Sequence, residues 1–281
     1  GYSNKNQSRI SISLNSLDEY IRDLSNAICT PEPSYEEIGV KVDGQYRQLN
    51  ANLLQIENEY YSSIRPKRVA RSGERPTAAL RRAGVEYVEV RSLDINMFDP
   101  SGINQNTMRF LESFLLYCMF EDSPKLDAAE LDDISYNHTG TAKRGRDPDF
   151  RLRRNGREVA LHEWASEILD KVHAVSQVID RHDDNYSAAI ASLRRLVDEP
   201  EATLSSRIVR ELEDTGTSFF EFARGMAKCH RDYFASIAPL SDAKADTFAT
   251  EATDSLQRQE AIEAADAISL DEYLDQYFRP C

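Results

Sequence analysis

The stretch GVEYVEVRSLD (residues 84–94) has the alternation of side chains that is typical of a β-strand. Tyr87, Glu89 and Arg91 would share one face, and the two valines between them the other, where we expect them to pack against an apolar neighbour. A carboxylate is a good ligand for Mg²⁺ and a guanidinium suits phosphate oxygens, so the polar face carries the groups that phosphate–metal chemistry needs. The alternative interpretation is a cross-strand ion pair on a solvated sheet face.

The segment QIENEYY (residues 55–61) indicates a second charged strand, in which Glu57, Glu59 and Tyr61 would share one face. The basic run that follows it is interpreted as a turn fixed by Pro66. Its three cations are Arg65, Lys67 and Arg68. A loop and a short helix then return the chain to the first strand. The pattern suggests neighbouring strands that line one charged site.

Four motifs, taken in this order, resemble the proteobacterial glutamate–cysteine ligase family, also called γ-glutamylcysteine synthetase. They are NKNQS (residues 4–8), LQIENE (54–59), IRPKR (64–68) and EYVEVRSLDIN (86–96). The resemblance is dense from residue 1 to about residue 124 and looser beyond, for example at 145–148 and 260–266. A match of this length is far more specific than a single short pattern.

The resemblance implies an α+β fold, namely the C-terminal half of a glutamine synthetase-like catalytic fold. Residues 1–100 would form part of the antiparallel active-site sheet, and residues 101–281 a mostly helical region packed on it in one continuous domain. Family members are longer than this chain, and Gly1-Tyr2 falls mid-chain in their pattern. We therefore expect the missing N-terminal half of the same enzyme, which carries a Glu-rich metal-binding motif, to be the chain's partner.

The activity implied by the resemblance joins L-glutamate to L-cysteine with ATP, the first step of glutathione biosynthesis. ATP phosphorylates the γ-carboxylate of glutamate, and the cysteine amine attacks the resulting γ-glutamyl phosphate. Mg²⁺ or Mn²⁺ would be the metal. Carried over residue by residue, the resemblance makes Glu89 a metal ligand and Arg91 the catalytic contact of ATP's transferred phosphoryl group.

The amino-acid and nucleotide contacts follow from the same resemblance. Tyr2 and Tyr61 match tyrosines of the cysteine pocket, where a hydroxyl can bond a carboxylate. Arg65 and Lys67 are candidates for contact with the anionic nucleotide, and the alternative for both is stabilisation of the Pro66 turn. Two other functions stay open. One is a carboxylate–amine ligase of the same fold that uses another amine, and the other is a non-catalytic half-protein acting as a subunit.

Composition agrees with a cytoplasmic protein. The formal net charge of -14 argues against nucleic acid or an anionic membrane as the main partner, and no apolar run approaches the ~20 residues of a membrane span. Neither a Walker pattern nor a dinucleotide fingerprint is present, and the cysteines and histidines lack metal-site spacing. A basic cluster, interpreted as a solvated loop or hairpin, comprises Lys143, Arg144, Arg146, Arg151, Arg153, Arg154 and Arg157.

The remaining sequence is predicted to be mainly helical. Ser16 begins a capped helix, and Asp43-Gly44 indicates the turn of a small hairpin. Residues 104–120 are predicted to form a buried helix that contains Cys118, and residues 127–157 are the most loop-like. Further helices are expected over 77–82, 161–181, 186–197, 203–213, 217–236 and 241–265.

Overall fold

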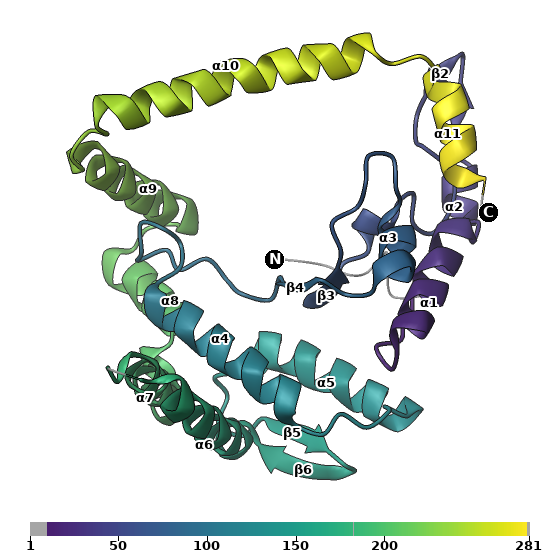
Figure 1. Ribbon diagram of the computed structural model, residues 1–281. Helices are drawn as coiled ribbons and strands as arrows, with labels where there is room; N and C mark the ends of the chain where they lie inside the picture. Colours follow the sequence, from purple (N-terminus) through teal and green to yellow (C-terminus); the bar gives the residue numbers. More distant parts are fainter. Residues whose placement is uncertain (1–9, 182, 280–281) are drawn as a thin grey trace. The chain divides into compact units, whose positions relative to one another are not determined.

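The computed structural model describes residues 10–181 and 183–279 (Figure 1). Contacts divide the chain into two compact units, one made of residues 1–93 and 239–281 and the other of residues 94–238. In the described residues, helices and three two-stranded antiparallel sheets confirm the α+β class. The expected boundary at residue 100 separates a catalytic sheet from a helical region, whereas the contact units place the C-terminal segment with the first unit.

The first unit is built around helix α1 (Leu17–Cys29), as its sequence predicts. The Ser16 side chain accepts a hydrogen bond from the Glu19 N–H at 3.1 Å and so caps the first turn. The helix buries one face against α3 and a neighbouring loop. That core comprises Tyr20, Ile21, Leu24, Ala27, Ile28, Leu54 and Leu80. Cys29 is disulfide-bonded, which the spacing of the cysteines did not lead us to expect.

The predicted hairpin is also confirmed, as β1 (Lys41–Val42) and β2 (Gln45–Tyr46). Its turn residues have positive φ angles, 52° at Asp43 and 78° at Gly44, which is the backbone that an Asp-Gly turn supplies. The remaining short elements of this unit are α2 (Pro33–Glu36), the 3₁₀ turn η2 (Glu57–Glu59) and α3 (Pro76–Ala83). Its C-terminal segment adds α10 (Asp242–Ala264) and α11 (Leu270–Phe278).

The 84–94 strand forms over β4 (Tyr87–Val90), paired antiparallel with β3 (Ile64–Lys67). The prediction of a basic turn around Pro66 is therefore wrong. A two-stranded sheet leaves an edge of each strand outside the ladder, where proline is tolerated. The expected apolar packing is not found for Val88, which is 44% exposed, whereas Val90 is half-buried.

The prediction of a strand over 55–61 is also wrong, since this segment contains the 3₁₀ turn η2. Glu57 lies inside the unit rather than beside Glu59 on a polar face. Its carboxylate accepts hydrogen bonds from Arg75, Thr77 and Tyr277. These partners come from elsewhere in the chain, so the local alternation of acids carries no sign of them.

The second unit is mainly helical, and five of the helices expected from the sequence are present in its described residues with small shifts at their ends. Those of the second unit are α4 (Gln105–Phe120), α6 (Leu161–Ile179), α7 (Asn185–Asp198), α8 (Leu204–Thr215) and α9 (Phe219–Ser236), with the 3₁₀ turn η3 (Pro200–Ala202). A core forms where α4, α6 and α7 meet, with Leu169, Val172 and Ile190 buried against Phe110 and Phe114. None of the helices in the described residues is both long and apolar enough to cross a membrane.

Two expectations for this unit fail. Helix α4 is only partly covered, because Met119 is 73% exposed and Cys118 is an exposed free thiol rather than a buried residue. The loop expected over 127–157 contains α5 (Ala128–Arg144) and the hairpin of β5 (Arg151–Arg154) and β6 (Arg157–Ala160). Helix α5 buries none of its residues fully. Such a helix needs no clear apolar stripe, which is the pattern by which helices are predicted from sequence.

Two helical glycines of this unit give opposite predictions for substitution by alanine. A Cβ on Gly140 of α5 would collide with the buried ring of Phe150, whereas one on Gly225 of α9 would meet nothing within 4 Å. Alanine favours a helix interior by about 1 kcal/mol, but overpacking costs about 1–3 kcal/mol. We expect Gly140→Ala to lower the free energy of unfolding and Gly225→Ala to raise it. Urea titrations of both variants measure this, and equal shifts would contradict the Phe150 contact.

A candidate active site on the β3–β4 sheet

The charged residues predicted from the sequence meet around the carboxylate of Glu89. In the register of the sheet Arg65 lies opposite Glu89. Its Nη2 lies 3.0 Å from Glu89 Oε2, and Lys67 Nζ lies 3.5 Å from the same oxygen. The other oxygen, Oε1, accepts a hydrogen bond from Arg91 Nη2 at 2.9 Å. One carboxylate thus bridges three cations.

Arg65 is the buried member of this cluster, with only 4% of its side chain exposed. Its Nη1 donates to two backbone carbonyls next to η2, Tyr60 O at 2.7 Å and Asn58 O at 3.2 Å. The Nε atom is buried without a partner. A guanidinium in this position can hold Glu89 and the backbone but has little surface with which to contact a ligand. The accessible cations are Arg91, 35% exposed, and Lys67, 23% exposed.

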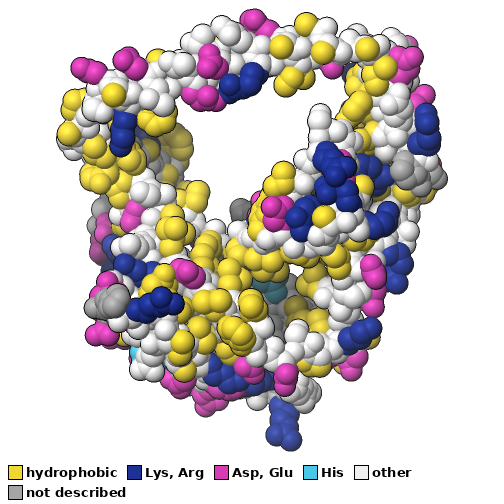
Figure 2. All heavy atoms as spheres, viewed as in Figure 1, with side chains coloured by type: hydrophobic (Ala, Val, Ile, Leu, Met, Phe, Trp, Pro, Cys, Tyr) yellow, Lys and Arg dark blue, Asp and Glu magenta, His cyan; other side chains and the backbone are white. Residues whose placement is uncertain are grey.

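The surrounding cations set the ionisation of Glu89. The hydrogen bond from Arg91, together with the positive charges of Arg65 and Lys67, lowers the pKa of Glu89 from 4.5 to about 2. The carboxylate is therefore ionised at neutral pH. Figure 2 shows further Lys and Arg side chains over the segment between β3 and α3, which carries Arg68, Arg71 and Arg75.

Tyrosines border the cluster. The guanidinium carbon of Arg91 lies 5.8 Å from the centre of the Tyr61 ring, and the Tyr61 hydroxyl donates to Arg91 O at 3.4 Å. Tyr20 and Tyr60 lie edge to face with ring centres 6.5 Å apart, and burial raises the pKa of Tyr20 to about 12. Tyr2, the other tyrosine predicted for an amino-acid pocket, lies outside the described residues.

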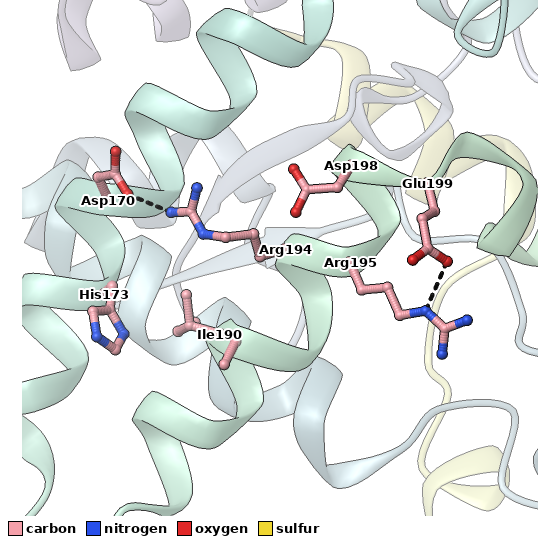
Figure 3. Close-up of a pocket in the computed structure, with 8 residues that line it drawn as sticks. Asp170, His173, Ile190, Arg194, Arg195, Asp198 and Glu199 are labelled. Atoms are coloured by element: carbon pink, nitrogen blue, oxygen red, sulfur yellow. Dashed lines mark hydrogen bonds and ion pairs between the residues drawn. The ribbon is translucent and has the colours of Figure 1, made fainter.

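Other charged features of the chain hold their side chains in internal pairs. In Figure 3, a hollow of about 350 Å³ between α6 and α7 is lined by Arg194, which pairs with Asp170, and by Arg195, which pairs with Glu199. In the basic cluster of residues 143–157, the guanidinium of Arg153 lies over Tyr136 and that of Arg154 pairs with Glu167. Of the predicted site residues that the structure describes, none lines the hollow between α6 and α7.

Comparison with known proteins assigns the chain to a family. The family model described as glutamate-cysteine ligase matches residues 1–141, half of the chain. The chain belongs to the glutamate–cysteine ligase family. The resemblance carried by the four sequence motifs is thereby confirmed.

Relatives extend the similarity along the whole chain. Glutamate–cysteine ligases of Alcanivorax borkumensis and Shewanella oneidensis are 48% and 45% identical to it, each over 99% of this chain. A crystal structure of the Francisella tularensis glutamate–cysteine ligase in complex with AMP superposes with a TM-score of 0.91 and 33% identity, over 98% of this chain. The chain spans about half the length of these relatives, 54% and 53% of the two enzymes and 55% of the crystallised chain.

Membership of this family does not by itself supply a metal site. The described residues contain no group of three or more acidic, histidine or cysteine side chains able to hold a metal ion. Glu89 offers one carboxylate, and both of its oxygens already contact cations. Mg²⁺ takes oxygen ligands, so this set alone does not fit it. A metal-ligand role for Glu89 stays a prediction and requires further ligands from outside the described residues.

The low pKa of Glu89 predicts how stability depends on pH. The ion pairs of Glu89 contribute fully above its ordinary pKa of 4.5 and are lost as pH falls from there towards the folded value of about 2. We expect Glu89→Gln to lower the free energy of unfolding at neutral pH by roughly 1–2 kcal/mol, because the buried charge of Arg65 loses its partner. This difference should shrink below pH 4.5, as wild-type Glu89 takes up a proton.

Urea titrations of the wild type and the variant from neutral to acidic pH measure the effect. Glu167→Gln, which breaks an exposed pair with Arg154, is the matched control and should cost less at neutral pH. A difference between wild type and Glu89→Gln that stays constant through acidic pH would show that Glu89 is not held ionised by the cluster.

Proposed function

We propose that this chain is the part of a glutamate–cysteine ligase that carries a phosphate-contacting sheet. The reaction is the ATP-dependent formation of γ-glutamylcysteine from L-glutamate and L-cysteine through γ-glutamyl phosphate, the first step of glutathione biosynthesis. The observation that carries the proposal is the 48% identity to a glutamate–cysteine ligase over 99% of the chain. The glutamine synthetase-like form of the catalytic sheet and a cytoplasmic location belong to this proposal.

ATP is the proposed co-substrate. The Francisella enzyme, whose fold this chain shares, is described in complex with AMP. In this chain three cations surround one carboxylate, which leaves a surplus of positive charge beside the sheet. The planar guanidinium of Arg91 and the ammonium of Lys67 are the accessible cations of the cluster, and both groups are suited to phosphate oxygens.

The chemistry places two anions close together. When the γ-phosphoryl group passes to the γ-carboxylate of glutamate, negative charge accumulates on both, and fixed cations lower the energy of that arrangement. We assign this role to Arg91, with Lys67 beside it. Glu89 orients both cations, and the buried Arg65 orients Glu89 and serves the nucleotide indirectly. Attack by the cysteine amine on the acyl phosphate then forms the amide and releases phosphate.

The remaining length of the family is part of the proposal as the chain's partner. Relatives carry further residues amounting to nearly half of their sequence, and the described residues here hold no metal cluster. We propose that the metal ligands missing beside Glu89, and the glutamate pocket, come from that additional length. The metal would supply charge neutralisation for ATP phosphates.

A chimera tests the function directly. These 281 residues replace the matching part of the Alcanivorax borkumensis ligase, and γ-glutamylcysteine formation and phosphate release are measured with ATP, glutamate and cysteine. We expect turnover in the ordinary range of roughly 1–1,000 per second, and none from the 281 residues alone. A chimera that is folded by its cooperative melting curve but inactive would contradict the proposal. Use of a different amine in place of cysteine would favour another carboxylate–amine ligase.

The exposed guanidinium of Arg91 gives a specific prediction within the chimera. Arg91→Lys keeps the positive charge but loses the planar fork, so kcat should fall about 10²-fold if one charge-stabilising contact of the transition state is lost. Added Mg²⁺ should not restore it, whereas raised Mg²⁺ should reduce the defect of Glu89→Gln if Glu89 helps to hold the metal. Arg82→Lys is the control, because Arg82 of α3 pairs with Glu74 in the loop before that helix. Unchanged kcat in Arg91→Lys would remove Arg91 from the reaction.

The hydroxyl of Tyr61 gives a second prediction, for the cysteine substrate. If it orients the cysteine carboxylate, Tyr61→Phe should weaken the use of cysteine by roughly 1–3 kcal/mol, with little change for ATP and glutamate. Steady-state kinetics of the chimera with each substrate varied in turn measure this. Tyr233→Phe, on the exposed surface of α9, is the control. An unchanged constant for cysteine would assign Tyr61 to packing against Arg91.

A further inference from the structure

A buried carboxylate lies beside the site and has no part in the reaction as proposed. The Glu57 side chain is only 1% exposed. Its Oε1 accepts hydrogen bonds from Thr77 Oγ1 at 2.7 Å and Arg75 Nε at 2.9 Å, and its Oε2 accepts one from the Tyr277 hydroxyl at 3.1 Å. A buried carboxylate is stable only with such partners, so Glu57 is fixed in place by three side chains.

Glu57 begins the turn whose backbone holds the buried cation of the site. Residues 57–59 form η2, and the carbonyls of Asn58 and Tyr60 accept both hydrogen bonds of Arg65 Nη1. Arg65 Nη2 contacts Glu89, which in turn contacts Arg91. An uninterrupted series of contacts therefore joins Glu57 to the guanidinium that we assign to the phosphoryl group.

The outermost partner of Glu57 comes from the other end of the chain. Tyr277 is 220 residues away in sequence, on α11. This helix begins with a full capping box at Ser269 and Glu272, and its Asp271 pairs with Lys41 of the β1–β2 hairpin at 2.8 Å. Figure 1 shows α11 beside that hairpin. Within the first unit, α11 thus contacts the β1–β2 hairpin at its start and, through Tyr277, Glu57 near its end.

The Tyr277 hydroxyl is suited to act as a fixed donor. Burial and the negative charge of Glu57 raise the pKa of Tyr277, so the hydroxyl keeps its proton at neutral pH and donates to the carboxylate. The guanidinium carbon of Arg75 lies 5.6 Å from the centre of the Tyr277 ring, so both the ring and the hydroxyl of this residue contact the Glu57 group.

We propose that Tyr277 is a positioning residue for the phosphoryl-transfer cluster, acting through Glu57, the η2 carbonyls and Arg65 on Glu89 and Arg91. The inference rests on the proposed function and adds a role for the C-terminal helix α11. Tyr277 touches neither the substrate nor the reacting atoms. Its effect lies in the placement of Arg91, which predicts a loss in kcat with little change in the use of cysteine.

Tyr277→Phe in the chimera removes only the hydroxyl that donates to Glu57. Tyr273→Phe on the same helix is the matched control, because the exposed Tyr273 packs its ring against that of Tyr277 but is not among the described hydrogen-bond partners of Glu57. We expect kcat to fall about tenfold in Tyr277→Phe, as for the loss of one hydrogen bond to a charged group, and to stay unchanged in Tyr273→Phe. The constant for cysteine should be unchanged in both. Equal kcat values for the two variants would overturn the inference.

A double-mutant cycle separates positioning from simple loss of stability. If Tyr277 acts through Arg91, the effect of Tyr277→Phe on kcat should nearly vanish in a chimera that already carries Arg91→Lys. If the double variant instead lost kcat by the product of the two single losses, Tyr277 would act independently of Arg91, which would contradict the inference. All kinetics are measured well below the melting temperature of each variant.

Amide hydrogen exchange in the 281-residue chain tests the inference without reference to activity. Tyr277→Phe should speed exchange across residues 57–67 and 87–91, and Tyr273→Phe should not. Unchanged protection of these segments in Tyr277→Phe would contradict the positioning role even if the chimera were active. An inactive wild-type chimera with the expected exchange pattern would count against the proposed function alone.

Discussion

The candidate site depends on the contacts made by the buried guanidinium of Arg65. A cation removed from water has to be matched by acceptors, and Arg65 finds them in two carbonyls beside η2 and in Glu89 of the opposite strand. These contacts fix the register of β3 against β4 and the path of the chain into β3 at the same time. A two-stranded sheet is only marginally stable by itself. The polar contacts of Arg65 therefore contribute much of the stability of the β3–β4 pairing.

Much of the first unit was predictable because its signals are local. The alternation in residues 84–94, the Asp-Gly turn and the Ser16 cap each act within a few residues, and β4, the β1–β2 hairpin and α1 form where they predict. Residues 55–61 show the limit of such signals. Their acids alternate as in a strand, yet the partner that contributes to the burial of Glu57 is 220 residues away, and the segment becomes a 3₁₀ turn.

The residues of the candidate site were predictable, but which of its cations is buried and which are accessible was not. Sequence alternation places Glu89 and Arg91 on one face, and they do share an ion pair. Nothing in the run IRPKR distinguishes Arg65 from Lys67, although Arg65 is buried and Lys67 is accessible. What distinguishes Arg65 is its pair of hydrogen bonds to the carbonyls of Asn58 and Tyr60, which come from the segment before β3. Helix α5 escaped prediction for a related reason, since an exposed helix needs no apolar stripe.

Charge balance explains why these roles are divided. The chain carries a net charge of -14, yet three cations and one carboxylate leave a formal surplus of +2 at the β3–β4 sheet. Such a surplus favours the binding of a phosphate anion beside the sheet. If all three cations contacted the phosphate directly, none of them would be held in place by the protein before the phosphate binds. Burying Arg65 keeps Glu89 in place, and Glu89 then holds Arg91 and Lys67 where a phosphoryl group can reach them. In the proposed reaction, the buried Arg65 therefore preorganises the site through Glu89.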